Sequence, residues 1–492
     1  MKEFHNTFLW LPLSLGTFLV SGCTWNSFVS EKASPGEKQC PNVLFFLVDD
    51  LRPALGCYGD SLAHTPNIDR LAGEGVVFQK AYCQQAVYNP SRASLLTGLR
   101  PDENGVTDLK THFREKVPDV VTLPQLFKNN GYYTVGTGKV FHALAQTVDP
   151  VSWTEPVPNY DKWEYLLPEN QTGKGKQNVT EFTEVHDTAY NDGKIAADAI
   201  RFLENARNKG KAFFLAVGFM KPHAPFVAPK KYWDIFNDTE FYVADRERVK
   251  GSPELAYHKW QEIRGYRDVP DTGPIPFEKE QEIIRGYYAC VSYIDAQIGK
   301  VMQRLEDLGL KENTIIVLWG DHGYHLGEQA SWCKSTNFEL DVRVPLIISA
   351  RGMKGNGHSC KAIVETLDIY PTLAELCKLE PESSLSGTSL QPLLMNPDQK
   401  WKNVAFSQFM RPYRTLFSSK DPSHMGYALR TPGWRTTWWF DLKTGEVVEK
   451  ELYRLSENSL EKENLSGRAD VEEIEEELGG MILDYKNGEY NE

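Results

Sequence analysis

Residues 42–50, "NVLFFLVDD", decide the fold, because six consecutive apolar side chains run directly into two aspartates. A short continuous apolar run is typical of a strand that is buried on both faces. Similar runs recur at residues 132–135, 213–217, 314–318 and 344–349, with helical patterns between them at 123–129, 192–206 and 283–308. This alternation predicts an α/β fold with a largely parallel central sheet flanked by helices.

The pattern changes near residues 397–403, where the large domain is expected to end. Beyond this point, residues 427–430 and 436–440 have the pattern of strands, and residues 472–483 have that of an acidic helix. We therefore expect four parts: a signal segment at 1–22, a tether at 23–41, a large α/β domain at 42–398 and a smaller C-terminal α+β domain at 399–492.

The first residues predict export. An apolar run at 8–20 is too short to span a bilayer and suits a signal peptide. It leads into "LVSGC" at 19–23, which resembles a bacterial lipoprotein cleavage box with Cys23 as the lipidated first residue of the mature protein. On this interpretation the protein is an exported bacterial lipoprotein at the periplasm or the outer-membrane surface. A secreted protein cleaved near Gly22 is the alternative.

The composition of the chain limits the kinds of ligand that it can bind. The 492 residues include 67 acidic and 54 basic side chains, which give a net charge of −13 without an acidic block. This balance disfavours a general nucleic-acid surface, so an anionic ligand must meet a local basic pocket. The eight cysteines show neither CxxC nor zinc-type spacing and predict no zinc site.

Polar side chains follow four of the predicted strands. In open α/β sheets, ligands bind outside the carboxyl ends of the strands, so we expect these side chains to converge on one site. They are Asp49-Asp50, Lys139 with His142, His223, and Asp321-His322.

The aspartate pair points to a divalent cation. Asp49 and Asp50 would repel each other at a buried strand end unless a positive charge lay between them. Both can turn toward one point because the strand period of two is broken there. Asp321 and His322 leave another strand in the same way, and such an oxygen-rich set suits calcium or magnesium better than zinc. Taken alone, each acidic pair is more simply explained by a helix cap or a solvated loop.

The stretch "PSRASLLTG" at 90–98 predicts a helix, with proline suited to its start and glycine to its C-terminal cap. Residue 88 then lies just ahead of a helix N-terminus, where free N–H groups favour an anion. Arg92, one turn inside, can hold a reacting oxygen or a carboxylate.

Four basic side chains complete the expected site: Lys139, His142, His223 and Lys334. An ester of a strong acid needs cations on its oxygens, a proton donor for the leaving alcohol and an in-line nucleophile. These four residues together with Arg92 meet the first two needs. Each of them alone is more simply a solvated or core side chain.

Several segments together, among them "NVLFFLVDDLRPALGCYGD", "PSRASLLTGLRPD" and "DHGYHLGEQASWCKSTNFELDVRVPLII", resemble formylglycine-dependent sulfatases of the alkaline phosphatase superfamily. The pair "GKVFH" and "KPHAPF" resembles the iduronate-2-sulfatase branch. The resemblance implies a mixed central sheet, a C-terminal domain with an antiparallel sheet that closes one side of the pocket, and a sulfated glycan or uronide as substrate.

The resemblance also implies a role for each site residue. Asp49, Asp50, Asp321 and His322 would bind Ca²⁺, with Mg²⁺ as a second possibility. Arg92, Lys139 and His142 would surround the nucleophile, while His223 and Lys334 would hold the sulfate and serve protonation of the leaving group.

One position departs from the family motif, in which a Cys or Ser followed by x-Pro-x-Arg is oxidised to formylglycine. Here that position is Tyr88, which cannot be oxidised to that group, so formylglycine is not expected. The phenol has an ordinary pKa of about 10, and its oxygen lies farther from the backbone. A tyrosine–sulfate intermediate would also lack the second hydroxyl that expels sulfate. Cys83 lies five positions earlier and is not followed by the motif.

Three functions stay open at this stage: a sulfatase that hydrolyses sulfate esters of sulfated uronic acids or glycans, a catalytically impaired pseudosulfatase that binds such glycans, and a metal-dependent phosphodiesterase or phosphonate hydrolase. In the loop at 149–187, Trp153, Trp163 and Tyr165 either pack the loop or stack on sugar rings.

Overall fold

The computed structural model describes residues 40–142, 148–158, 160, 165–171, 177–243, 246–382, 384–418, 421–456 and 460–490. The expected signal segment at 1–22, Cys23 and Trp163 lie outside these ranges. Within them, no helix combines the length and the apolar character that crossing a bilayer requires.

The strand at the start of the described chain lies in the middle of the central sheet. The sheet has seven strands in the spatial order β3 (Tyr133–Gly138), β5 (Phe213–Phe219), β1 (Asn42–Val48), β7 (Thr314–Gly320), β8 (Arg343–Ser349), β2 (Val76–Tyr82) and β9 (Ser359–Glu365). β3, β5, β1 and β7 are mutually parallel, while β8 runs antiparallel to both of its neighbours. The predicted α/β fold with a mixed, mostly parallel sheet is confirmed.

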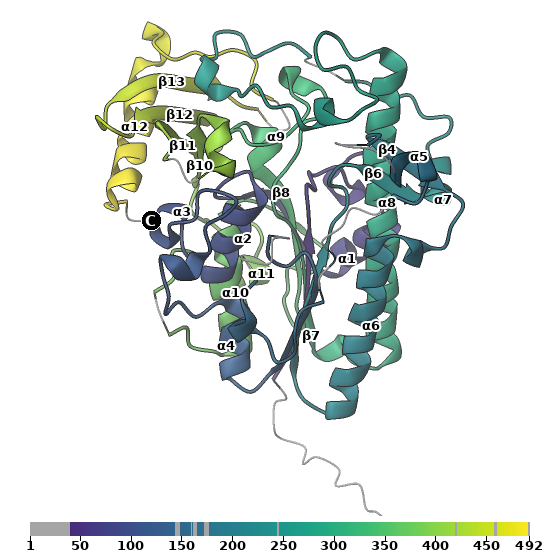
Figure 1. The fold of residues 1–492 in the computed structure, drawn as a ribbon. Coiled ribbons are helices and arrows are strands. Elements are labelled where there is room, and N and C mark those ends of the chain that lie inside the picture. The colour runs from purple at the N-terminus through teal and green to yellow at the C-terminus, as the bar shows by residue number, and fades with distance from the viewer. Residues whose placement is uncertain are drawn as a thin grey trace, which may run out of the picture. The chain divides into compact units, whose positions relative to one another are not determined.

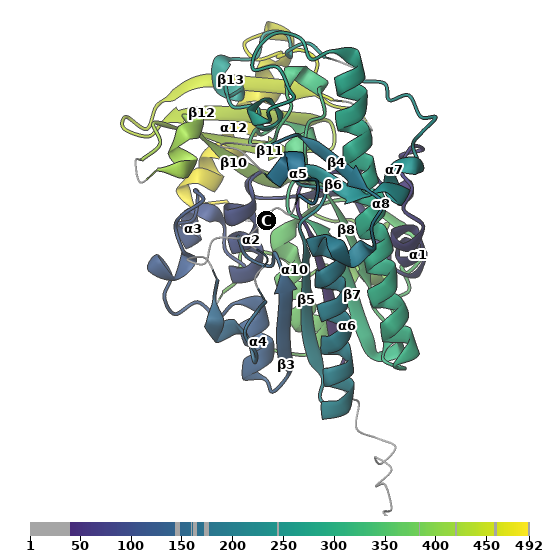
Figure 2. The ribbon, with the colours of Figure 1, turned by 45° about the vertical axis from the view of Figure 1, so that its right-hand side comes forward.

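Successive residues of β1 enter two separate hydrophobic cores, because side chains alternate between the faces of a strand. Val43, Phe45 and Leu47 pack with α2 (Tyr88–Thr97), α4 (Leu123–Asn129) and α10 (Ile369–Cys377). Leu44, Phe46 and Val48 pack with α1 (Pro66–Glu74), α6 (Asn191–Lys209) and α8 (Phe277–Asp307). The two sets of helices cover opposite faces of the sheet (Figure 1, Figure 2). Burial on both faces explains the unbroken apolar run.

The C-terminal region forms the predicted antiparallel sheet. Its four strands are β10 (Ala405–Arg411), β11 (His424–Arg430), β12 (Trp434–Asp441) and β13 (Val447–Arg454), in that spatial order. The acidic helix α12 (Glu472–Asn487) packs against β11 and β12. The sequence pattern indicated only the two middle strands.

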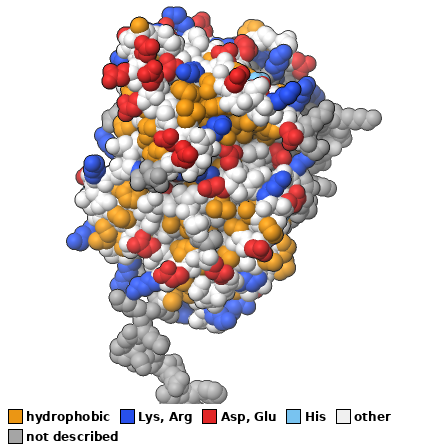
Figure 3. Space-filling model, turned by 90° about the vertical axis from the view of Figure 1, so that its left-hand side faces the viewer, with side chains coloured by type: hydrophobic (Ala, Val, Ile, Leu, Met, Phe, Trp, Pro, Cys, Tyr) orange, Lys and Arg blue, Asp and Glu red, His pale blue; other side chains and the backbone are white. Residues whose placement is uncertain are grey.

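The remaining strands and α-helices are short. They are the parallel pair β4 (Thr180–Thr183) and β6 (Phe226–Pro229), and the helices α3 (Pro101–Asn104), α5 (Pro168–Gln171), α7 (Lys230–Asp234), α9 (Glu339–Val342) and α11 (Gln391–Met395). On the face drawn in Figure 3, acidic and basic side chains are interspersed with hydrophobic ones, so this face offers no continuous basic surface.

Two of the loop aromatic residues have a structural role. Trp153 is only 4% exposed and packs edge-on against Phe141, with ring centroids 6.2 Å apart. The hydroxyl of Tyr165 donates a hydrogen bond to the backbone oxygen of Asn178 at 2.7 Å. Trp153 is therefore a core residue and is not available to stack on a sugar.

Candidate functional site

The carboxyl ends of four adjacent parallel strands bring the predicted residues together. Val48 at the end of β1 is in register with Phe219 at the end of β5 and with Gly320 at the end of β7. The segments that follow these strands and β3 therefore start at one edge of the sheet. They carry Asp49, Asp50, Lys139, His142, His223, Asp321 and His322.

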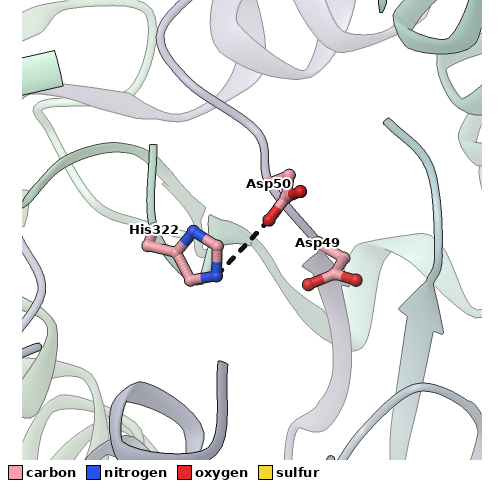
Figure 4. Close-up of side chains that lie close together, drawn as sticks. All are labelled: Asp49, Asp50 and His322. Atoms are coloured by element: carbon pink, nitrogen blue, oxygen red, sulfur yellow. Dashed lines mark ion pairs between the residues drawn. The ribbon is translucent and has the colours of Figure 1, made fainter. Parts of the chain in front are cut away.

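Asp49, Asp50 and His322 form a buried cluster. One ligand atom from each of the three side chains lies within 4.8 Å of the others. Nε2 of His322 is 3.4 Å from Oδ1 of Asp50, and the carboxylate of Asp49 lies beside them (Figure 4). All three side chains are inaccessible to solvent. Residues from two neighbouring strand ends thus offer oxygen and nitrogen ligands to one point.

The backbone at Asp50 explains how consecutive carboxylates reach the same point. Asp50 has φ of +60°, in the left-handed region that a non-glycine residue seldom adopts. Its N–H donates to Oδ1 of Asp321 at 3.1 Å, and its carbonyl accepts from the Tyr287 hydroxyl at 2.8 Å. These two hydrogen bonds hold the strained turn in place.

The carboxylate of Asp321 accepts hydrogen bonds from the residues around the cluster. Its Oδ1 also accepts the backbone N–H of His322 at 3.0 Å, and its Oδ2 accepts Nε–H of Arg92 at 2.9 Å. Burial by itself would raise the pKa of Asp321, but His322, Arg92 and Lys139 together hold it below the ordinary value. Asp321 is therefore a carboxylate, and its oxygens already support the backbone of the two neighbouring candidate ligands.

The cations pair with the aspartates one by one. Nζ of Lys334 contacts the two carboxylate oxygens of Asp50 at 2.9 and 2.8 Å, and Nζ of Lys139 pairs with Asp49. Nη2 of Arg92 lies 3.8 Å from Asp49. Burial lowers the pKa of Lys334, but Asp50 and neighbouring acids outweigh this effect and raise it well above the ordinary value.

A divalent cation fits the donor set. Nδ1 of His322 lies 3.0 Å from the backbone oxygen of Gly323, which can only accept, so this nitrogen carries the proton of the neutral ring. Burial lowers the pKa of His322, which favours that neutral ring. Nε2 then directs a lone pair at the carboxylate of Asp50, and two acceptors that face each other need either a cation or a proton between them. Nε2 of His322 and Oδ1 of Asp49 are also buried without a hydrogen-bond partner in the described chain.

The charge balance agrees with this fit. Four carboxylates, those of Asp49, Asp50, Asp321 and Glu262, face the three cations Arg92, Lys139 and Lys334. Burial and the neighbouring acids raise the pKa of Asp50 well above its ordinary value, even though Lys334 lowers it. A divalent cation would relieve this excess of negative charge and give the pocket the positive character that an oxyanion needs.

Tyr88 is the first residue of α2 and lies next to this cluster, with Nζ of Lys334 5.6 Å from the centroid of its ring. Its ring stacks on that of His142 with centroids 4.4 Å apart, and Nζ of Lys139 lies 4.3 Å from its centroid. The rings of His223 and His322 have centroids 6.3 and 6.4 Å from that of Tyr88. Burial raises the pKa of the Tyr88 phenol above 10, with Lys334 acting in the opposite direction. At neutral pH the hydroxyl therefore keeps its proton.

The two histidines beside Tyr88 are neutral. Burial, reinforced by Lys139, lowers the pKa of His142 to about 3. Burial also lowers the pKa of His223 well below its usual range. Nδ1 of His223 is 2.5 Å from the backbone oxygen of Ala224 and therefore carries the proton of the neutral ring. Its Nε2 lies 3.6 Å from Glu262 and 4.0 Å from Asp50, and in the neutral ring it can accept a proton.

The sequence analysis missed Glu262 and Ser91. Glu262 lies 3.6 Å from Nε2 of His223 and 3.1 Å from Nζ of Lys334, and it forms a second group with Asp50 and His223 that could hold a metal ion. Ser91 donates its hydroxyl hydrogen bond to the backbone oxygen of Asp321 at 2.5 Å. No strand end or motif marks Glu262, whereas Ser91 lies within the stretch at 90–98 and went unassigned.

Comparison with known proteins agrees with the geometry. The sulfatase family model matches residues 41–379, and the model of the N-sulphoglucosamine sulphohydrolase C-terminal region matches residues 327–487. Mouse iduronate 2-sulfatase is 34% identical over an alignment that covers 93% of this chain and 96% of the mouse protein. The human iduronate 2-sulfatase is 33% identical with the same coverage.

Solved structures share the fold. The structure of BT4656 with its substrate D-glucosamine-2-N,6-O-disulfate is 25% identical, has a TM-score of 0.72 and covers 91% of this chain and 98% of its own. The fold and the site thus define an alkaline phosphatase-like α/β protein with a buried acidic and histidine cluster that could bind a metal ion. Within that class, the chain belongs to the sulfatase family. The family and these relatives indicate a sulfuric ester hydrolase.

Proposed function

We propose that the protein hydrolyses sulfate esters of sulfated uronic acids or related glycans, in the manner of the iduronate 2-sulfatases that it resembles. The observation that carries the proposal is the convergence of the acidic cluster with Arg92, Lys139 and Lys334 on one site at the strand ends. Such a site matches the small sulfate ester group, which spreads one negative charge over three terminal oxygens, and leaves the sugar to be recognised by the surrounding loops.

Calcium is the proposed cofactor, with magnesium as the second possibility. Asp49, Asp50 and His322 would hold the ion, and Asp321 would complete or support the ligand set. Their oxygen-rich chemistry favours a hard cation. When bound, the ion supplies positive charge next to a sulfate oxygen and so stabilises the charge that develops during ester cleavage.

The remaining groups have separable tasks. Lys139 and Lys334 hold sulfate oxygens by charge-assisted hydrogen bonds, and Arg92 fixes the start of α2 to Asp321. The leaving alcohol takes its proton from Nζ of Lys334, and Nε2 of His223, on the other side of Glu262, is an acceptor in the neutral ring. His142 stacks on Tyr88 and keeps the phenol at the N-terminus of α2.

Tyr88 supports a second candidate, which is glycan binding without turnover. Its buried phenol keeps its proton at neutral pH, and a phenol lacks the second hydroxyl through which a hydrated formylglycine releases sulfate. Such a protein would keep the pocket and lose the reaction. The phosphodiesterase or phosphonate hydrolase alternative has no comparable support, because phosphonate monoester hydrolase of Agrobacterium radiobacter, at 23% identity and a TM-score of 0.73, shares the fold alone.

A pair of proteins separates the two candidates: the native chain and Tyr88→Cys, the latter expressed with a formylglycine-generating enzyme. Both are incubated with 4-nitrophenyl sulfate and with defined sulfated uronides, and released sulfate is measured by ion chromatography. Release by the native protein supports hydrolysis. Release by Tyr88→Cys alone overturns hydrolysis by the native chain, and calorimetric binding of the same uronides to the native chain would then support the binding function.

We further propose that the protein is an exported lipoprotein anchored by a lipid at Cys23, with its pocket exposed in the periplasm or at the outer-membrane surface. The support is the "LVSGC" stretch after an apolar run. Membrane fractionation of native protein and Cys23→Ser tests this proposal, since only the native chain should remain with the membrane.

A further inference from the structure

The segment 258–262 arches over Lys334, one of the proposed sulfate-holding residues. Nε2 of His258 donates to the backbone oxygen of Lys334 at 2.7 Å, and Glu262 at the other end contacts Nζ of the same lysine at 3.1 Å. Trp260 is the middle residue of this arch, about 7 Å along the backbone from either anchor. It is 38% exposed.

A second segment meets the arch from the C-terminal region. The ring of Tyr413 stacks on His258 with centroids 4.4 Å apart and planes 13° from parallel. Trp260 is also within 13° of parallel to Tyr413, at 6.4 Å. Phe417 lies 5.7 Å from Tyr413 and is 49% exposed. We call His258, Trp260, Tyr413 and Phe417 the aromatic shelf.

Arg411 fixes the two halves of the shelf to each other. Its buried guanidinium donates to the backbone oxygens of Leu255 at 2.9 Å, of Tyr257 at 3.0 Å and of Ala256 at 3.1 Å. Burial lowers the pKa of Arg411 to about 10, so it remains charged at neutral pH. The shelf is thus held in place before any ligand arrives, which lowers the entropic cost of binding.

The shelf also lies beside Lys334. His258, on which Tyr413 stacks, contacts the backbone oxygen of this lysine, and Glu262, two residues after Trp260, contacts its Nζ. Exposed aromatic rings gathered beside a polar pocket are the usual composition of a ligand site.

We propose that the aromatic shelf is a sugar subsite, in which a pyranose ring of the sulfated glycan packs its apolar C–H face against Trp260 and Tyr413 while its sulfate lies at Lys334. This inference rests on the proposed function and deepens it. Flat aromatic side chains offer a large apolar area together with a polar tip, which suits a sugar ring with one apolar face and hydroxyls at its edge. The occupant is the sugar next to the sulfate, because the shelf continues directly from Lys334.

The test uses the full chain and calorimetric titration with three probes: a disaccharide with a 2-O-sulfated uronate, the same disaccharide without sulfate, and inorganic sulfate. We expect Trp260→Ala and Tyr413→Leu to weaken binding of the sulfated disaccharide by about tenfold each, the size expected for loss of one aromatic contact. Binding of inorganic sulfate should change by less than about twofold, because the sulfate-holding groups remain.

Trp434→Ala is the matched control. Trp434 is a partly buried tryptophan at the end of the C-terminal sheet opposite Arg411, as the pairing of Ala405 with Arg430 and of Arg430 with Arg435 shows. The Trp434→Ala variant should bind the sulfated disaccharide and inorganic sulfate as the native chain does. Thermal unfolding of all variants distinguishes local from global effects.

Unchanged affinity for the sulfated disaccharide in both shelf variants would overturn the sugar subsite while leaving the proposed function intact. If the shelf variants lost affinity for inorganic sulfate as much as for the sulfated disaccharide, the sugar subsite would also be overturned, since the shelf would then act by positioning Lys334. If the native chain binds neither sulfated probe, the proposed function itself fails, and the subsite fails with it.

Discussion

The two sides of the pocket differ in what they retain. The cation side, formed by Asp49, Asp50, Asp321 and His322, keeps a set of buried ligand atoms that face one another and are held by a strained backbone turn. The nucleophile side, formed by Tyr88 and His142, is a stack of two neutral rings. The phenol keeps its proton, and the imidazole carries no charge. The residues of the cation side follow strands β1 and β7. On the nucleophile side, His142 follows β3 of the same sheet, and Tyr88 is the first residue of α2.

The difference shows that binding and reaction place separate demands on one pocket. A carboxylate cluster can hold a cation and an oxyanion whatever residue opens α2, since its geometry depends on the β1 and β7 ends. Turnover depends on the chemistry of a single atom at position 88. Each prediction below changes one side of the pocket, or the residue that joins the sides, and asks what happens to the other.

The largest expected effect comes from deletion of one oxygen. Tyr88→Phe removes only the hydroxyl and keeps the ring on His142, so the cation side should remain intact. If the native chain hydrolyses sulfate esters through this hydroxyl, turnover should fall at least on the order of 10³-fold, as for other lost nucleophiles. Binding of inorganic sulfate should not change. Sulfate release and calorimetry measure the two quantities, and retained turnover would remove Tyr88 from the reaction.

Arg92 joins the two sides, because it lies on α2 and contacts Asp321 and Asp49. Arg92→Met leaves buried carboxylates without their partner, so the free energy of unfolding should fall by about 4 kcal/mol. Arg201→Met is the matched control, since the ion pair of Arg201 with Asp198 is half exposed and should cost less than about 1 kcal/mol. Urea denaturation measures both values. Equal stability of the two variants would show that the pocket sides are not coupled through Arg92.

The sequence predicted the cation side more completely than the rest of the site. Consecutive polar residues after apolar runs mark strand ends, and parallel strands bring their ends together, so local pattern and topology carried that prediction. Glu262 has no such marker, because it comes from a short 3₁₀ turn whose position depends on tertiary packing. The left-handed backbone of Asp50 is likewise set by a hydrogen bond that it donates to Asp321 and one that it accepts from Tyr287, both more than 230 positions away.

The fold shows the same division. Fully buried strands such as β1 and β7 are continuous apolar runs and were predicted. β9 at the sheet edge and β13 at the edge of the C-terminal sheet contain both exposed and buried residues and were not predicted. Trp153 is a residue type that commonly stacks on sugars, but it lies in the core. Trp260, which belongs to the sugar subsite that we propose, lies in an irregular loop and is partly exposed. Burial of a single aromatic side chain depends on contacts that no local pattern encodes.

A buried ion pair supports the loop that carries the cation side and Lys334. Nδ1 of His325 contacts Asp341 at 2.7 Å, and Asp341 also accepts the N–H of Thr336 at 2.9 Å. Asp341, with help from Glu328, outweighs burial and raises the pKa of His325 from 6.5 to about 9. Because the folded pKa is the higher one, the stabilisation is fully present below pH 6.5 and is lost as the pH rises through 9.

His325→Gln should therefore lower the free energy of unfolding by about 3 kcal/mol at pH 6, and the difference from the native chain should shrink between pH 6.5 and 9.5. Urea denaturation at several pH values measures this trend. His64→Gln, at an exposed position, is the control for general effects of pH. A difference that stays constant over the range would show that the pair is not charged in the folded protein.

The smallest predicted effect tests the cation side by itself. A calcium concentration of about 100 times the dissociation constant should raise the free energy of unfolding by about 2.7 kcal/mol, because the ion binds only the folded chain. Asp49→Asn should lose most of this gain, since it removes a charged ligand from a cluster in which Oδ1 of Asp49 has no hydrogen-bond partner in the described chain. Thermal unfolding with calcium, with magnesium and with a chelator measures the gain for each ion.

Tyr88→Phe and Asp470→Asn complete this experiment. The first should keep the full calcium gain if the two sides of the pocket are independent, and the second should keep it because Asp470 is an exposed residue paired with Arg468 on the surface. An equal gain in Asp49→Asn would place the ion elsewhere. Loss of the gain in Tyr88→Phe would instead show that the phenol oxygen helps to hold the ion, so that the two sides act as one unit.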